Sequence, residues 1–188
     1  TLLAPGEHPE LAGASIGDDT LVFTGDGLFG LFGAELRPSP LGEVVNDVIR
    51  MHDSASGNLW LLAEDGVSVW RDGQVHTISS DAIPADLNTV MSAIAPWEES
   101  DALWIADGMS LVGLTFDGTM ARAWSLDLEN PPLALAGNTD GLWLLSENEL
   151  VMMNPAGIWS GYQRPSGVAD LSGRHSAPDL WLFDPTNL

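Results

Sequence analysis

The chain is built from short apolar runs that alternate with turns rich in Gly, Asp and Pro. The runs are about five to seven residues long, and no longer window shows a clean helical period of 3.6 residues. Apolar runs of this length, bounded by turn-forming residues, are typical of β-strands rather than helices. The pattern therefore predicts an all-β protein made of many short strands.

One phrase, an apolar run centred on Trp, recurs along the chain. It reads "NLWLLAE" at 58–64, "ALWIAD" at 102–107, "GLWLLSE" at 141–147 and "DLWLFD" at 179–184, with a weaker copy, "TLVFTG", at 20–25. The central residues are Val22, Trp60, Trp104, Trp143 and Trp181, at intervals of 38, 44, 39 and 38 residues. A period near 40 residues made of strands is typical of a β-propeller, in which each blade has four strands. A β-sandwich also uses short strands, but it does not predict a Trp at this interval.

The second copy shows how one blade is predicted to fold. Strand A is "NDVIRMHD" (46–53), and strand B is the apolar run "NLWLLAE", which suits a strand buried on both faces. Strands C ("VSVWR") and D ("QVHTI") follow, each preceded by an Asp-Gly pair. Asp-Gly adopts the positive φ that tight hairpin turns need. The same A–B–C–D order is predicted for the other copies.

The sequence predicts a single β-propeller domain of four-stranded antiparallel blades, most simply five. The expected blades cover residues 11–40, 44–80, 89–127, 133–165 and 167–188. The last contains only strands A and B, and residues 1–10 are expected to add one outer strand and close the ring. The alternative is a partial propeller, cut from a longer precursor, whose remaining blades lie elsewhere.

The segment "GNLWLLAEDGVSVWRDGQVHTI" (57–78) resembles the repeat of the two-component-regulator propeller family. That repeat usually has a Gly-Asn-Leu-Trp-Ile run, then Gly-Thr, an Asp/Gly turn and an aromatic strand C. This chain has Leu62-Ala63 where the family has Gly-Thr. The resemblance implies a WD40-like propeller with an extracytoplasmic sensing or docking role, hence a periplasmic, secreted or cell-surface location. It implies no catalytic residues.

The charge of the chain restricts its partners. There are 27 acidic and 6 basic residues, for a formal net charge of −21. Such a surface repels nucleic acid and anionic lipid, and it suits a basic partner, metal ions or plain solubility. The absence of Cys excludes disulfides, thiol catalysis and thiolate metal sites. No apolar run approaches the roughly 18 residues of a membrane span.

Acidic residues recur at the predicted B–C turns. They include Asp26, Asp65, Asp107 and Glu147, with Glu64 and Asp184 nearby. One interpretation is a divalent cation site, since Ca²⁺ binds carboxylate and carbonyl oxygens. A second is a binding face for a basic protein, and the third is that Asp-Gly simply makes the turns. No EF-hand loop pattern is present, so the four residues are weak metal candidates.

The predicted A–B turns supply the candidate partner-binding residues. They are Trp97, Glu98, Glu99, His52, Asp53, Arg174 and His175. Trp97, beside Pro96, is expected to be an exposed aromatic of the type found at binding hot spots; alternatively it packs over the end of the ring. The repeat predicts equivalent positions for His52 and His175, where they could bind a metal or act as acid and base. The alternative is two exposed loop histidines.

The functional prediction is a non-catalytic interaction or accessory-subunit module. The chain has no Gly-x-Ser-x-Gly elbow and no phosphate loop, and no cofactor is predicted beyond the divalent cation considered above. The expected partner is a protein with a basic face, not nucleic acid. The alternatives are an extracytoplasmic ligand- or metal-sensing domain, or an enzyme that uses the mouth of the central channel.

Overall fold

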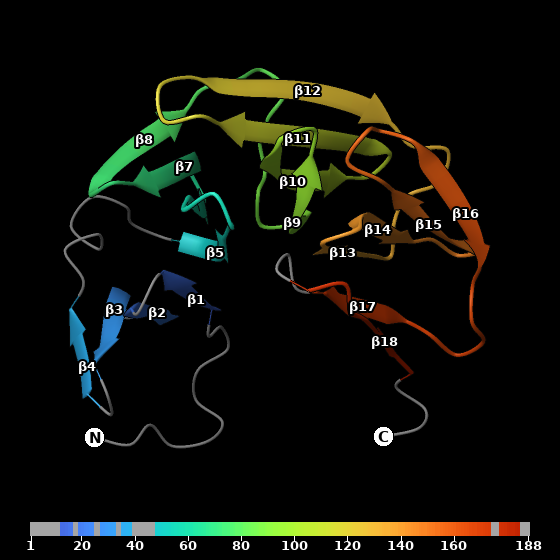
Figure 1. Ribbon diagram of the computed structural model, residues 1–188, viewed down its shortest axis with the longest axis horizontal. Helices are drawn as coiled ribbons and strands as arrows, with labels where there is room; N and C mark the ends of the chain where they lie inside the picture. Colours follow the sequence, from blue (N-terminus) through green and yellow to red (C-terminus); the bar gives the residue numbers. More distant parts are fainter. Residues whose placement is uncertain are drawn as a thin grey trace. The chain divides into compact units, whose positions relative to one another are not determined.

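The computed structural model describes residues 12–16, 19–24, 27–32, 35–38, 48–173 and 177–184. These residues form strands and the turns between them, arranged as four four-stranded antiparallel sheets and one two-stranded sheet (Figure 1). None of the described residues belongs to a helix that could cross a membrane. The all-β prediction is confirmed. The predicted closing strand, residues 1–10, lies outside the described residues.

The chain divides into two compact units, and the first contains β1 to β8. Blade one consists of β1 (Ala12–Ile16), β2 (Asp19–Thr24), β3 (Gly27–Phe32) and β4 (Glu35–Pro38). Blade two consists of β5 (Val48–Asp53), β6 (Leu59–Ala63), β7 (Gly66–Arg71) and β8 (Gln74–Ile78). In both blades each strand pairs with the next in the sequence, and the first strands, β1 and β5, are neighbours.

The second unit contains β9 to β18. Blade three consists of β9 (Met91–Trp97), β10 (Ser100–Asp107), β11 (Ser110–Phe116) and β12 (Ala121–Asp127). Blade four consists of β13 (Ala134–Asn138), β14 (Gly141–Leu145), β15 (Glu149–Met153) and β16 (Trp159–Gln163). Blade five has two described strands, β17 (Asp170–Gly173) and β18 (Leu180–Phe183). The strands lie where the repeat predicts them.

The recurring Trp occupies one register position in every blade that has it. Trp60 lies opposite His52 and Val69, Trp104 opposite Ala93 and Gly113, and Trp143 opposite Ala136 and Met152. Trp60 and Trp104 are completely buried, as predicted for the repeat core. Trp181, opposite Ser172, is instead 61% exposed. The repeat predicts a buried core Trp at position 181 as at 60, 104 and 143, and this prediction is wrong for Trp181; in the described residues no outer strand follows β18.

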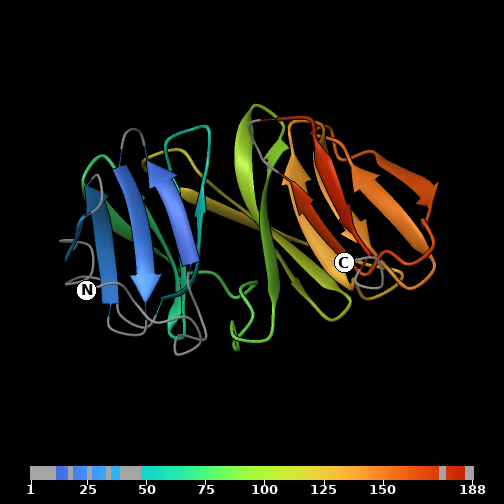
Figure 2. The same cartoon turned by 90° about the horizontal axis from the view of Figure 1, so that it is seen from below.

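The inner strands of the second unit approach one another to backbone contact. A Cβ atom added to Gly137 on β13 would overlap the carbonyl oxygen of Ile94 on β9. A Cβ atom on Gly173 of β17 would likewise overlap the carbonyl oxygen of Gly137. These glycines let β9, β13 and β17 lie side by side, and the remaining strands of each sheet fan outward from them (Figure 1; Figure 2 gives the view from below). This is the arrangement of propeller blades around an axis.

The core of the second unit lies between the faces of adjacent blades. The main cluster joins Ala93, Ala95, Trp104 and Leu111 of blade three to Leu142, Leu144 and Met153 of blade four. A second cluster joins blade four to blade five through Leu145, Val168 and Leu171. Burial of apolar area between sheets is the main stabilising term here. The chain is therefore an all-β propeller.

Candidate functional site

The predicted residues Trp97, Glu98 and Glu99 line a cavity of about 680 Å³ at the turn end of blade three. We call it the turn pocket. Its wall combines the A–B turn with the C–D turn of the same blade, as the alternating strand directions require. The other lining residues are Ser100, Thr115, Phe116, Asp117, Met120, Arg122 and Trp124.

Trp97 is half-buried, which corrects the expectation of an exposed aromatic. Its ring stacks on Trp124 at a centroid distance of 5.3 Å, and it meets Trp104 edge-on at 5.1 Å. A Cβ atom on Gly157, in the C–D turn of blade four, would lie 3.0 Å from the same ring. These contacts hold Trp97 in place as a wall of the turn pocket.

The charges of the turn pocket are mixed. Glu98 and Glu99 are exposed, and the Glu98 N–H donates a hydrogen bond to the Pro155 carbonyl at 2.8 Å. The Asp117 carboxylate accepts hydrogen bonds from the N–H groups of Met120 and Thr119 and from the Thr119 hydroxyl. The Met120 N–H, then Thr119, lower the pKa of Asp117 to about 2. Arg122 lines the same pocket, so a cationic ligand would meet attraction and repulsion together.

The histidine candidates differ from the prediction. His52 and Asp53 lie within β5 rather than in the turn after it, and both are half-buried. His52 faces Trp60 in register, and the residue that faces Trp181 is Ser172. Ser172, not His175, is therefore the structural equivalent of His52. Arg174 and His175 lie outside the described residues, and their predicted role stays a prediction.

The acidic B–C turns are at the surface. Asp65, Asp107 and Glu147 are exposed, whereas Asp26 lies outside the described residues. In the part of the chain that is described, no three His, Asp or Glu side chains gather so as to hold a metal ion. Asp107 ends β10 and precedes Gly108, whose φ is +56°. That position fits the turn-forming interpretation of Asp-Gly.

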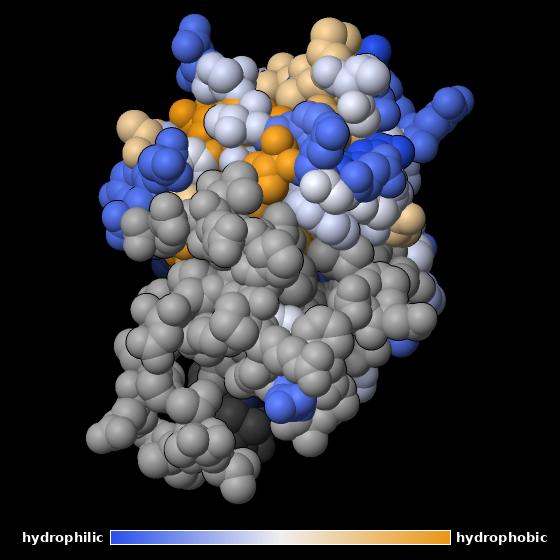
Figure 3. Space-filling model, turned by 90° about the vertical axis from the view of Figure 1, so that its left-hand side faces the viewer, coloured by the Kyte–Doolittle hydropathy of each residue, from blue (hydrophilic) through white to orange (hydrophobic). Residues whose placement is uncertain are grey.

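Figure 3 shows mainly hydrophilic residues on the described part of one face, around a smaller hydrophobic area.

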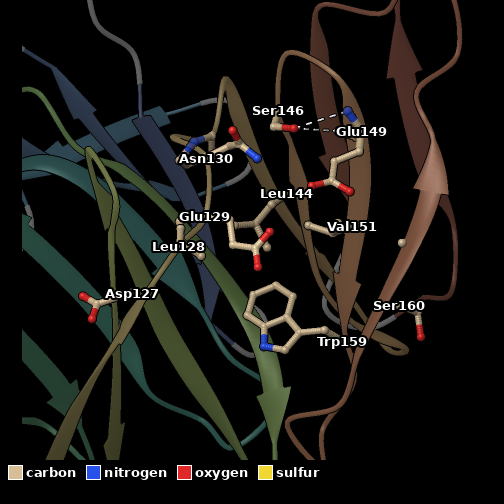
Figure 4. Close-up of a pocket in the computed structure, with 12 residues that line it drawn as sticks. Asp127, Leu128, Glu129, Asn130, Leu144, Ser146, Glu149, Val151, Trp159 and Ser160 are labelled. Carbon is tan, nitrogen blue, oxygen red and sulfur yellow. Dashed lines mark hydrogen bonds between the residues drawn. The ribbon is translucent and has the colours of Figure 1, made fainter.

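A second cavity, of about 430 Å³, lies where the link after β12 passes beside blade four. We call it the link pocket (Figure 4). The link contributes Asp127, Leu128, Glu129, Asn130 and Pro132. Strands β14 to β16 and the turn after β14 contribute Leu144, Ser146, Glu149, Val151, Trp159, Ser160 and Gly161.

The link pocket combines negative charge with an aromatic surface. Glu129 and Glu149 supply two carboxylates, whereas the side chain of Asp127 points away from them in Figure 4, and none of the lining residues is basic. Trp159 is 41% exposed, and it is drawn together with Glu129 and Glu149 around this space in Figure 4. Leu144 and Val151 add an apolar lining. This combination suits a cationic group with an aliphatic stem.

Hydrogen bonds fix both walls of the link pocket. The Ser146 hydroxyl accepts from the Glu149 N–H at 3.3 Å and donates to the Glu149 carbonyl at 3.2 Å. The Leu128 N–H donates to the Met109 carbonyl at 2.7 Å, which ties the link to blade three. The pocket is thus held by hydrogen bonds to the backbone of both blades.

Sequence reasoning missed the link pocket. Glu129 belongs to a D–A link, whereas Trp159 begins a strand D about thirty residues later. The segment "DLENPP" (127–132) contained the only local signal, two acidic residues before two prolines. No single run of residues contains the whole site.

The fold defines the class of protein: the chain is a β-propeller repeat protein. No family model and no curated protein matches it. Among solved structures, virginiamycin B lyase from Staphylococcus aureus is similar, with a TM-score of 0.61, 15% identity, and coverage of 93% of this chain and 62% of the lyase. PorZ, a bacterial surface component of the type-IX secretion system of Porphyromonas gingivalis, is also similar. Its TM-score is 0.59 at 14% identity, and the match covers 93% of this chain and 23% of PorZ.

The extracellular domain of BT4673 from B. thetaiotaomicron, assigned as a hybrid two-component system, is also similar. The TM-score is 0.59 at 11% identity, and the match covers 85% of this chain and 24% of that one. The chain thus spans less than two thirds of each of these proteins. At such identities the likeness shows the fold alone, which agrees with the propeller repeat predicted from the sequence.

Proposed function

We propose that this propeller is a non-catalytic interaction module that binds a basic segment of a partner protein in the link pocket. The observation that carries the proposal is the presence of Glu129 and Glu149 beside the partly exposed ring of Trp159, with no basic residue in the lining (Figure 4). An Arg or Lys side chain of the partner is the proposed occupant.

The physical basis is complementary charge in a partly enclosed space. The carboxylates attract the cation, the indole face adds a cation–π contact, and the apolar lining packs against the aliphatic stem. The net charge of −21 also steers a basic partner toward the surface from a distance. The turn pocket is a weaker candidate because it contains Arg122.

We also propose an extracytoplasmic location. PorZ is described as a surface component and the BT4673 neighbour is an extracellular domain, and these descriptions support the proposal by analogy. The lyase shows that the same architecture also hosts an enzyme. We favour a binding role here because the carboxylates, the indole ring and the apolar lining of the link pocket are together sufficient to bind a cationic side chain.

The test is calorimetric titration with an amidated Gly-Arg-Gly-Arg-Gly peptide at low and high NaCl. We expect measurable binding that weakens with salt. The double variant Glu129→Gln/Glu149→Gln should weaken it about tenfold, since two partly exposed charge contacts are lost. The control Glu64→Gln/Asp65→Asn removes two exposed charges elsewhere and should change the affinity less than about twofold.

Two results would overturn the proposal. Equal weakening by both double variants would mean that the peptide responds only to the overall charge. No binding of the peptide at low salt would mean that the link pocket does not take a basic side chain.

A further inference from the structure

The turn pocket combines an apolar lining with charges of both signs. Its apolar side chains are Trp97, Phe116, Met120 and Trp124. Its charged side chains are Glu98, Glu99, Asp117 and Arg122, all of them exposed. A ligand with a single charge would meet repulsion from one of these groups, whereas a ligand with a positive and a negative group can satisfy both signs. The lining therefore matches a zwitterion with an apolar body.

The charged groups of the turn pocket differ in what they already bind. The Asp117 carboxylate accepts a hydrogen bond from the Met120 N–H at 2.9 Å. Within the described ranges, no carboxylate forms an ion pair with the guanidinium of Arg122. The carboxylates of Glu98 and Glu99 likewise accept no hydrogen bond from the described residues. Arg122 and the two glutamates are thus the groups that a ligand can bind.

Glu98 occupies a backbone position that favours glycine. It is the first residue of the two-residue turn between Trp97 and Ser100, and its φ is +53°. Glycine is usual there, because a side chain is strained at such a φ. The other non-glycine residue with a positive φ in the part of the chain that is described is Asp72, and aspartate adopts this conformation more readily than glutamate. Strained backbone of this kind is found mostly at functional sites.

A free α-amino acid fits the chemistry of this lining. Its ammonium group would bind the carboxylates of Glu98 and Glu99, and its carboxylate would accept paired hydrogen bonds from the planar guanidinium of Arg122. A large apolar side chain on the same carbon atom would pack against the indoles of Trp97 and Trp124. A residue inside a polypeptide lacks both charges, so the complementary ligand is the free amino acid rather than a peptide segment.

We propose that the turn pocket binds a free α-amino acid with a large apolar side chain. Arg122 holds the carboxylate of the ligand, and the strained Glu98, together with Glu99, holds the ammonium group. This inference does not depend on the link pocket, whose residues are different.

L-Phenylalanine is the probe for the turn pocket, because it adds no indole of its own. The indole N–H signals of the whole 188-residue chain would be followed by NMR during titration at constant ionic strength. We expect the signals of Trp97 and Trp124 to shift and to saturate with a Kd on the order of 1 mM. The signal of Trp60, which is completely buried in blade two, should not move.

Two analogues of the probe test the two charges separately. L-Phenylalaninamide keeps the ammonium group without the carboxylate, and N-acetyl-L-phenylalanine keeps the carboxylate without the ammonium group. Each should bind about three- to tenfold more weakly than L-phenylalanine, because one charged contact is lost. Arg122→Gln should weaken L-phenylalanine by the same factor without weakening L-phenylalaninamide.

Glu98→Gly separates binding from stability. It should weaken L-phenylalanine about three- to tenfold without weakening N-acetyl-L-phenylalanine. The same variant should raise the melting temperature, because glycine relieves the strain of the positive φ. The matched control is Asp72→Gly, which removes a carboxylate from the second positive-φ position and should leave the affinity for L-phenylalanine unchanged.

Three outcomes would overturn the proposal. Absence of shifts at Trp97 and Trp124 at 20-fold the expected Kd, about 20 mM, would mean that the pocket takes no amino acid. Equal affinity for L-phenylalanine and both analogues would mean that only the apolar ring binds. Equal effects of Glu98→Gly and Asp72→Gly on the affinity would mean that Glu98 acts only through the overall charge of the protein.

Discussion

Trp97 and Trp124 lie on the two edge strands of blade three, yet their rings stack at a centroid distance of 5.3 Å with planes 29° apart. Their strands are separated by β10 and β11, about 14 Å in an ordinary sheet. Gly113 on β11 makes the approach possible, because it lies opposite Trp104 and Trp124 and has no side chain. The three indoles pack together, and two of them, Trp97 and Trp124, line the turn pocket.

The substitution Gly113→Ala should destabilise the protein although alanine suits a strand better than glycine. The new Cβ atom would lie 2.8 Å from a ring atom of Trp104 and 2.8 Å from one of Trp124. Overpacking of this kind costs about 1–3 kcal/mol. Urea unfolding would measure this destabilisation as a lower midpoint concentration of urea, with the dependence of the unfolding free energy on urea concentration (the m-value) unchanged.

The matched control is Gly161→Ala on the exposed strand β16. A Cβ atom there has as its nearest neighbour a Glu149 carboxylate oxygen at 3.8 Å, which is ordinary contact. The change in stability should stay within about 0.5 kcal/mol. Equal stability of both variants would mean that the indole cluster relaxes around an added methyl group.

Asn138 should stabilise blade four and its contact with blade five rather than bind a partner. The side chain is 1% exposed, and its Oδ1 atom accepts hydrogen bonds from the Asp140 N–H, the Gly141 N–H and the Trp143 indole. Its Nδ2 group donates to the Pro178 carbonyl at 2.8 Å. Asn138→Ala leaves buried groups without partners and should cost about 2–4 kcal/mol.

The control for this substitution is Asn148→Ala, at an exposed turn position of the same blade. It should be close to neutral. Hydrogen exchange gives a second measurement, because Asn138→Ala should also speed exchange in residues 177–184, where the contact to Pro178 is lost. A neutral Asn138→Ala would show that water replaces the network.

The strand framework could be predicted because its determinants are local. The Leu-Trp runs, their Asp-Gly turns and the spacing of Trp60, Trp104 and Trp143 each lie within one repeat. Trp181 shows the limit of that reasoning. It has the same local sequence as its equivalents, but its burial depends on outer strands that the described residues of blade five do not include.

The candidate sites were harder to predict because they depend on contacts between repeats. Trp97 looked like an exposed turn residue, and only the position of Trp124 shows that it stacks. The link pocket joins Glu129 to Glu149 and Trp159, which belong to different blades. Distances of this kind are set by the packing of whole sheets, and a one-dimensional pattern does not report them.

Asp117 should titrate well below an ordinary aspartate. Hydrogen bonds from Met120 and Thr119 lower its pKa from 3.8 to about 2. A depressed folded-state pKa stabilises the protein above the unfolded value, and this contribution is lost as the pH falls from about 4 to about 2. The destabilisation caused by Asp117→Ala should therefore be full at neutral pH and should shrink across that window.

Carboxyl NMR titration of the folded protein measures the same property directly. The chemical shift of the Asp117 carboxyl carbon should have its midpoint near pH 2. A midpoint near 3.8 would mean that the turn does not hold the carboxylate in solution. The stability difference of Asp117→Ala would then stay constant also across the window from about pH 4 to about pH 2.

Gly137→Ala should be the most damaging of the glycine substitutions, because the obstacle is backbone rather than side chain. The added Cβ atom would overlap the carbonyl oxygen of Ile94, which no rotamer change can move. Relief requires β13 to move away from β9, and this would open the core between blades three and four. We expect Gly137→Ala to lower the free energy of unfolding by more than about 3 kcal/mol, or to give no folded protein. The corresponding decrease is about 1–3 kcal/mol for Gly113→Ala and close to zero for Gly161→Ala. The rank order tests the fold itself: a Gly137→Ala variant as stable as Gly161→Ala would mean that the inner strands do not touch as described.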